Sequence, residues 1–350
     1  MNEENNQEVL QAINRAIKHK ARFFAYRLPG SECYEFGAQL IEQQSHIGFA
    51  IYPFAVTSDA QPTFIACQYD AKAFLKVPAT TMDSSCTSLR PVENHSTEHH
   101  DYLQLAHRAI EEMKQGKFRK LVLSRTIVGG HVISDWASIF RSLCENNKQS
   151  FVFFYNTAET GAWLGVTPEQ FLSSHHRNVS CMALAATKPF DSNRPWTAKE
   201  VEEQAFVADF IAQKMQELGI KYTKSETSDR RAGNVKHICN LFTAERLTMS
   251  QIEKMKNALH PTPAISGLPQ VDAVKFVMQN EKHRRLYYGG YIGPVYATGD
   301  FDFFVNLRSM MFDSSRYCIY SGGGLTAQSN ADDEWEETEM KSQLLREHMK

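Results

Sequence analysis

The side chains best suited to chemistry gather near the end of the chain, where three glycines precede an acidic stretch. A short β-like run ends in Gly322, Gly323 and Gly324, whose backbone N–H groups can approach an anion because no side chain is in the way, and a polar loop follows; the glycines are therefore a predicted anion-binding loop. Four polar residues at helical spacing come next: Glu334, Glu337, Thr338 and Lys341. Because this spacing puts them on one helix face, they could hold a metal ion and a carboxylated ligand. The alternative is a solvent-exposed acidic helix, the usual setting of a charge run.

A second candidate is Lys120, which begins the apolar run 120–125. Strand alternation puts Lys120, Val122 and Ser124 on one face of the predicted strand. A lysine at the start of an apolar strand is normally a surface residue. We therefore expect a chemical role for Lys120 only if its face borders a cleft.

Several elements must position these residues. Residues 197–218 predict a long helix, with Thr197 as N-cap and Glu200 in the capping-box position. Short apolar runs separated by short turns between residues 120 and 190 favour a large, mostly antiparallel sheet, since parallel strands need long crossovers.

Two further strands are expected near the C-terminal end of the chain. They span residues 287–293 and 301–308. In the second of them, Asn306 and Arg308 should share one face.

Composition excludes several classes of protein. The chain has 350 residues and a net charge of -2, which gives no general attraction for nucleic acid. No apolar run is long enough to span a bilayer, and the polar start of the chain lacks the features of a secretory signal. The seven cysteines include no CxxC pair, so neither a disulfide framework nor a zinc site is indicated. We expect a cytoplasmic protein that binds neither nucleic acid nor membrane.

Eight short motifs, in order between about residue 117 and residue 342, resemble those of the chorismate-utilising enzymes. This family includes isochorismate and salicylate synthases and the large subunits of anthranilate and aminodeoxychorismate synthases. The motifs are KLVLSR (120–125), LGVTPE (164–169), ALAAT (183–187), HPTPA (260–264), YGGYIG (288–293), NLR (306–308), SGGG (321–324) and EWEET (334–338). A single match would be weak, whereas eight in the same order make chance a poor explanation.

The resemblance implies an α/β fold of the α+β type, with two large, mostly antiparallel sheets and outer helices. It implies one chorismate-binding domain over residues 1–350, with the motifs in 99–345 and an N-terminal sheet portion in 1–98. It also implies Mg²⁺ as cofactor. The metal carboxylates of the family fall on Glu203 and Glu337, with Glu200 and Glu334 one helical turn away. Mg²⁺ is typically held by a few carboxylates together with substrate oxygens, which agrees with the acidic face described above.

The resemblance also implies a substrate site for chorismate and a pair of catalytic residues. The base falls on Lys120 and the acid on Glu169; the base needs a lowered pKa and the acid a raised one. Arg308 and the three glycines correspond to a pocket for the enolpyruvyl carboxylate, which an arginine can grip with two hydrogen bonds. The other implied substrate-binding positions are Ala185, Thr187, His260, Ala264, Tyr288 and Lys341.

Within the family, isochorismate synthase is the closest branch. Aminodeoxychorismate synthases carry a nucleophilic lysine where this chain has Ala185, and a small residue leaves room for water. No glutaminase segment is present and no glutaminase subunit is expected. Three departures from the family pattern, at Ala186, Lys188 and Gln204, affect the expected positioning of substrate more than the reaction class.

Alternatives remain open on the sequence. Salicylate synthases share Lys120 and Ala185 and add pyruvate elimination, and a catalytically silent protein that binds chorismate or another anion is a further possibility. Menaquinone and siderophore synthesis both use isochorismate, and we favour menaquinone. We expect a monomer.

Overall fold

Two large antiparallel sheets form the centre of the molecule. The computed structural model describes residues 2–42, 45–83, 89–233 and 235–349. Within them, the first sheet has eight strands in the order β13 (Gly267–Leu268), β5 (Lys120–Gly130), β17 (Arg316–Leu325), β16 (Ser309–Phe312), β7 (Gly161–Thr167), β6 (Phe151–Thr157), β1 (Arg22–Arg27) and β2 (Glu35–Gln39). The second has nine: β10 (Thr223–Lys224), β12 (Val235–Ala244), β9 (Asn178–Pro189), β8 (Gln170–His175), β15 (Phe301–Val305), β14 (Tyr291–Val295), β3 (Gly48–Tyr52) and β4 (Thr63–Ala66), with β11 (Ser228–Ala232) paired to β12.

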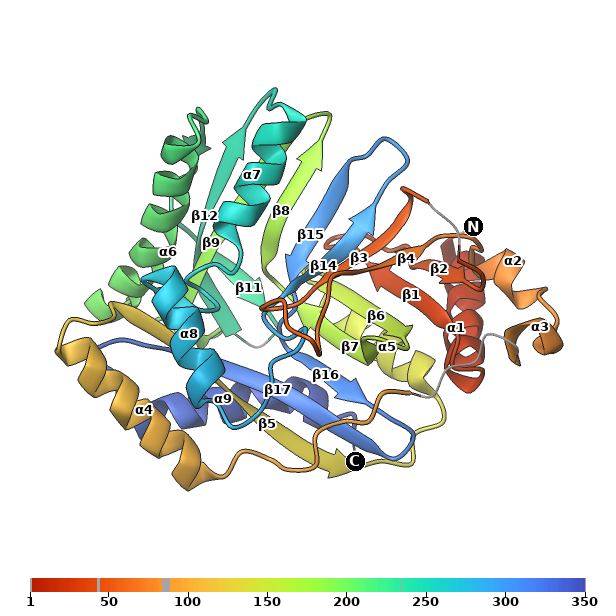
Figure 1. Ribbon diagram of the computed structural model, residues 1–350, viewed down its shortest axis with the longest axis horizontal. Coiled ribbons are helices and arrows are strands. Elements are labelled where there is room, and N and C mark those ends of the chain that lie inside the picture. Colours follow the sequence, from red (N-terminus) through yellow and green to blue (C-terminus); the bar gives the residue numbers. More distant parts are fainter. Residues whose placement is uncertain (1, 43–44, 84–88, 234, 350) are drawn as a thin grey trace.

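Helices cover the outer sides of both sheets (Figure 1). They are α1 (Asn2–Lys18), α2 (Ala71–Leu75), α3 (Ala79–Asp83), α4 (His99–Lys114), α5 (Trp136–Asn146), α6 (Ala198–Glu217), α7 (Met249–Leu259), α8 (Gln270–Asn280) and α9 (Ala331–Arg346). An aromatic cluster that includes Phe49, Phe151 and Phe304 joins strands of the two sheets. This arrangement confirms the predicted fold class.

None of the helices in the described part of the chain combines the length and apolar character that a membrane crossing requires.

The chain passes from one sheet to the other through two very short segments. Pro168 and Glu169 link β7 of the first sheet to β8 of the second, and residues 306–308 link β15 of the second sheet to β16 of the first. Each crossing is hydrogen-bonded to a strand that leads to or from the other crossing. Val305 N–H of β15 donates to the Glu169 carbonyl at 3.0 Å, and Val166 N–H of β7 donates to the Arg308 carbonyl at 3.1 Å. Glu169 and Arg308 therefore lie in neighbouring sheet-to-sheet crossings.

A β-bulge disturbs the pairing of β9 with β12. Ile238 pairs with Ala185 and Lys236 pairs with Lys188, so two residues of β9 oppose the single His237. Ala186, the first of these two, has a φ of 59°, in the left-handed region that non-glycine residues rarely adopt. Such bulges redirect side chains and are common beside active sites.

Some local predictions are confirmed and others are wrong. Thr197 caps α6 in a capping box with Glu200, as predicted. The anion-binding loop predicted at the glycines is wrong, because Gly322–Gly324 are the last part of β17 and pair with β5. The strand predicted over 287–293 begins only at Tyr291, after a turn. The strand predicted over 301–308 ends at Val305, so Asn306 and Arg308 do not share a strand face.

Candidate active site

One cavity collects most of the predicted site residues. It encloses about 800 Å³, a volume that includes the part open to solvent. The predicted residues that line it are Lys120, Glu169, Ala185, Thr187, Glu203, Ala264, Tyr288, Arg308, Gly322, Gly323, Gly324, Glu337 and Lys341. They come from both sheets, from α6 and α9, and from the connecting segments.

Lys120 is buried and forms an ion pair within the cavity. Its Nζ lies 3.0 Å from Oε1 of Glu203, and its side chain is 1% exposed. Gly324 lies against this pair: a Cβ there would be 2.6 Å from Glu203 Oε1 and 3.2 Å from Lys120 Cε. The glycine therefore makes room for the ion pair, a role that differs from the predicted anion-binding loop.

Glu169 is buried in the sheet crossing between β7 and β8. Burial raises the pKa of its carboxyl group from 4.5 to about 8, although the charges of Lys120, Lys341 and Arg308 act to lower it. A carboxyl group with this pKa carries a proton at neutral pH. It can therefore donate that proton to a leaving group.

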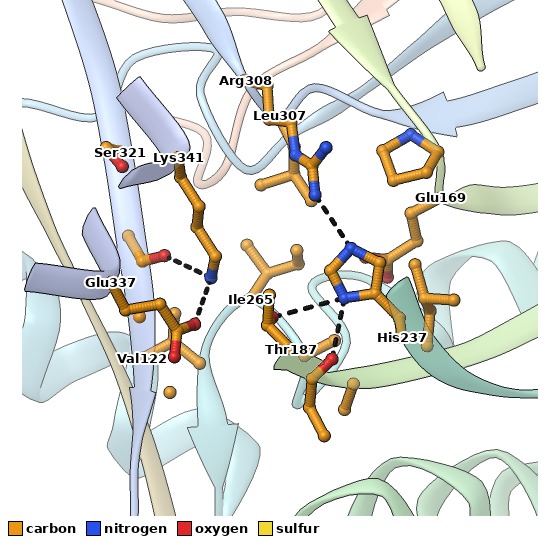
Figure 2. Close-up of a pocket in the computed structure, with 18 of the residues that line it drawn as sticks. Val122, Glu169, Thr187, His237, Ile265, Leu307, Arg308, Ser321, Glu337 and Lys341 are labelled. Atoms are coloured by element: carbon orange, nitrogen blue, oxygen red, sulfur yellow. Dashed lines mark hydrogen bonds and ion pairs between the residues drawn. The ribbon is translucent and has the colours of Figure 1, made fainter. Parts of the chain in front are cut away.

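Arg308 lies beside a histidine that the sequence analysis missed. Arg308 Nη2 donates to Nε2 of His237 at 2.8 Å, so the proton of the neutral imidazole must be on Nδ1, which donates to the Ala186 carbonyl at 2.7 Å. Thr187 Oγ1 lies 3.3 Å from the same Nδ1 (Figure 2). Burial, and next the Arg308 charge, holds the pKa of His237 well below 6.5. A neutral histidine thus orients the guanidinium at the cavity wall.

The acidic face of α9 contacts the edge of the cavity. Lys341 Nζ lies 2.6 Å from Oε1 of Glu337 and donates to the Gly322 carbonyl at 3.0 Å (Figure 2). Glu334 is buried behind them and forms an ion pair with Lys199 of α6 at 3.1 Å. The predicted shared helix face is confirmed, and the alternative of a solvent-exposed helix is wrong for Glu334, which is only 4% exposed.

The donor set fits a Mg²⁺ ion held by few protein ligands. Within the described residues, no group of three or more His, Cys, Asp or Glu side chains could hold a metal by itself. Glu203 and Glu337 nevertheless line the same cavity, and Mg²⁺ usually takes one or two carboxylates and completes its shell with water and substrate. Burial, and next the charge of Glu337, raises the pKa of Glu334 above its ordinary value. In this structure Glu203, Glu334 and Glu337 are paired with Lys120, Lys199 and Lys341, so a divalent cation would share these carboxylates with the three ammonium groups.

Three predicted site residues lie outside the cavity lining: Glu200, His260 and Glu334, the last of which is described above. Glu200 is held in the α6 capping box and pairs with Arg194 at 2.6 Å. His260 is buried among Phe171 and Tyr291, and its Nε2 lies 2.9 Å from the Pro53 carbonyl.

The departures from the family pattern mostly face away from the cavity. Gln204 is buried and donates to Asn240 Oδ1 at 2.7 Å. Lys188 donates to the Arg194 carbonyl at 2.6 Å, and its Nζ lies 4.0 Å from the ring centre of Trp196. Neither side chain lines the cavity, whereas Ala186 does.

The fold and the site together define an enzyme-like α/β protein with a carboxylate-lined cavity between two antiparallel sheets. Residues 38–350 match the sequence model of the family described as chorismate binding enzyme. The chain therefore belongs to this family.

Relatives with known names are similar in sequence or in fold. The chloroplastic isochorismate synthase of Catharanthus roseus is 29% identical over 266 residues, which cover 69% of this chain and 44% of that protein. Anthranilate synthase component 1 of Cereibacter sphaeroides is 25% identical over 71% of this chain and 52% of its own length. The chain thus spans about half the length of these relatives. The menaquinone-specific isochorismate synthase MenF of Escherichia coli shares the fold, with a TM-score of 0.74, 18% identity and coverage of 94% of this chain and 89% of that one.

Proposed function

We propose that the protein is an isochorismate synthase, which adds water to chorismate at C2 while the C4 hydroxyl leaves. The observation that carries this proposal is the burial of Lys120 and Glu169 in one cavity, with the pKa of Glu169 raised to about 8. The names of several relatives support the same reaction.

Glu169 is proposed as the general acid. The C4 hydroxyl is a poor leaving group unless it receives a proton as its bond to carbon breaks. Glu169 holds that proton at neutral pH because its carboxylate form is disfavoured by burial. Its backbone is hydrogen-bonded to β15, which keeps the acid at a fixed place in the cavity wall.

Lys120 is proposed as the general base, which removes a proton from the attacking water. Glu203, 3.0 Å from its Nζ, forms an ion pair with Lys120 and holds the amine in place, so the base role requires that Lys120 first gives up its own proton. Ala185 lines the cavity with a side chain too small to compete with water. One water enters and one leaves, so the reaction is an isomerisation with no net change in atoms.

Arg308 is proposed to bind the enolpyruvyl carboxylate of the substrate. Its fork of donors suits a carboxylate, and His237 fixes its orientation from the opposite side. Thr187, Tyr288, Ala264, Lys341 and the glycines of β17 complete the substrate wall as proposed contacts.

Glu203 and Glu337 are proposed to hold Mg²⁺, with Glu334 as a buried neighbour that adds negative charge. When bound, the metal supplies a Lewis acid that fixes the ring carboxylate of chorismate and withdraws charge from it. We do not extend this role to Glu200, because its carboxylate is committed to Arg194 and the helix cap.

Product analysis tests the proposal. Purified protein is incubated with chorismate and Mg²⁺, and the products are separated by chromatography; isochorismate is the expected product. Salicylate with pyruvate would instead identify a salicylate synthase, and turnover only with ammonia would identify an aminating enzyme. Chorismate binding by calorimetry without any turnover would identify a silent binding protein.

The wider setting is proposed from the family. We infer a single-domain, monomeric, cytoplasmic enzyme whose partner is the small molecule chorismate, without a glutaminase subunit. Menaquinone synthesis is the use of isochorismate that we favour, and siderophore synthesis is the alternative.

A further inference from the structure

A buried ion pair lies beside the cavity and has no part in the reaction proposed above. Glu281 follows directly after α8, and Arg285 lies four residues later in the turn that leads to Tyr288. Arg285 Nη2 and Glu281 Oε1 are 2.6 Å apart, and both side chains are 2% exposed. Arg285 also borders the cavity.

The guanidinium of Arg285 bridges two adjacent backbone segments of the cavity wall. Its Nη1 donates to the Ile265 carbonyl at 2.9 Å, and its Nη2 donates to the Val122 carbonyl at 2.6 Å. Val122 belongs to β5, whereas Ile265 belongs to the segment before the two-residue strand β13. Arg285 therefore reinforces the contact between β5 and the 264–266 wall, where Val122 N–H already donates to the Ser266 carbonyl at 3.0 Å next to the two residue pairs of β13.

Glu281 accepts hydrogen bonds from β5 at Ser124, two residues after Val122. Its Oε1 accepts from the backbone N–H of Ser124 at 2.6 Å and from Ser124 Oγ at 3.0 Å. The pair thus holds β5 at Val122 through Arg285 and at Ser124 through Glu281. Lys120, the proposed base, is on the same strand and the same face.

Stability alone is a weak reason for such a pair. Removing two charges from water costs several kcal/mol per ion, and well-packed apolar residues of similar volume often give equal or greater stability. The pair instead contributes defined geometry. A planar guanidinium that is held by a carboxylate can donate to two carbonyl groups in fixed directions. Those two carbonyl groups belong to neighbouring segments of the cavity wall, since Val122 N–H also donates to the Ser266 carbonyl at 3.0 Å.

We propose that Glu281 and Arg285 are positioning residues, which set the separation between the strand that carries Lys120 and the wall formed by Ala264 and Ile265. This inference rests on the proposed function, because it concerns the placement of the base. A small misplacement of a catalytic group can lower the rate by about 100-fold without loss of binding, since proximity contributes to the barrier and much less to substrate affinity.

Arg285→Lys tests the inference, because it keeps the charge and replaces the two-pronged guanidinium with a single ammonium group. The matched control is Arg284→Lys at the preceding, 60% exposed arginine, which pairs with Asp59 and Glu93 on the surface. Thermal unfolding, kcat, KM and calorimetric binding of chorismate are measured for both. We expect kcat of Arg285→Lys to fall by at least about tenfold, with chorismate affinity within about threefold of the parent, and Arg284→Lys to match the parent protein.

A kcat of Arg285→Lys equal to that of the parent would overturn the positioning role, and so would an equal loss of kcat and affinity. If Arg285→Lys does not fold, Ser124→Ala decides the question, because it removes one hydrogen bond to Glu281 and should lower kcat in the same selective way. A parent protein that forms no isochorismate refutes the proposed function before any variant is compared. An active parent with an unaffected Ser124→Ala or Arg285→Lys refutes the positioning role alone.

Discussion

Glu169→Gln separates the acid role of this residue from its place in the fold. Glutamine has nearly the same shape but cannot give up a proton, so kcat should fall by about 10²- to 10⁴-fold. Chorismate affinity should change little, because the substrate carboxylates are assigned to other residues. In the parent protein, kcat/KM should fall as pH rises through about 8, where Glu169 of the free protein loses its proton.

The same substitution has a stability signature with a defined sign. The pKa of Glu169 is about 8 in the folded protein and 4.5 as the ordinary value. The stability associated with the protonated carboxyl is fully present below pH 4.5 and is lost progressively until pH 8. Since each pH unit corresponds to about 1.36 kcal/mol, the loss over this window amounts to about 5 kcal/mol. Glu169→Gln lacks this dependence, so it should gain stability relative to the parent as pH rises.

Denaturant unfolding at a series of pH values between 4.5 and 9, in metal-free buffer, measures this difference. Comparison with the parent at each pH cancels the other titrating groups. The control is Glu226→Gln, at an exposed glutamate outside the cavity, which should follow the parent at every pH. Parallel curves for Glu169→Gln and the parent would refute the assignment of Glu169 as a buried, protonated acid.

Three further substitutions address the other groups of the site. Lys120→Ala should abolish isochorismate formation while calorimetric binding of chorismate is retained; full activity would remove the base assignment. Gly324→Ala should lower kcat by at least about tenfold, because its Cβ would lie 2.6 Å from Glu203 Oε1, and normal kinetics would show that the ion pair adjusts without cost. Lys199→Met should tighten Mn²⁺ binding in the absence of substrate by about tenfold, since it removes a cation beside Glu334; unchanged affinity in a spectroscopic titration would contradict this.

The sequence predicted features that depend on local patterns. The α6 capping box follows from Thr197 and Glu200, three residues apart, and the face of α9 follows from helical spacing. The two-sheet fold was predicted from the ordered motifs and the short connections between strands. Each of these signals is contained within a few residues or in the order of short segments.

Features that depend on distant pairing could not be predicted in this way. A run of three glycines is compatible with a loop or a strand, and only the pairing with β5 decides between them. In the sequence, His237 resembles any other strand residue. It belongs to the site because the bulge in β9 places the Ala186 carbonyl within hydrogen-bonding distance of its Nδ1. Arg308 leaves the expected strand because the chain must change sheets there, with a φ of 45°.

The two sheet crossings fix the distance between Glu169 and Arg308. Each crossing has only two or three residues and is hydrogen-bonded to a strand that adjoins the other crossing. An inserted residue in either crossing would therefore disturb these hydrogen bonds. The spacing between the proposed acid and the substrate-binding arginine is therefore inherited from strand pairing, whereas the carboxylates proposed for the metal are carried by helices. Redesign of α6 or α9 could change the choice of metal while the distance from Glu169 to Arg308 is preserved, but a single added residue in either crossing would alter that distance at once.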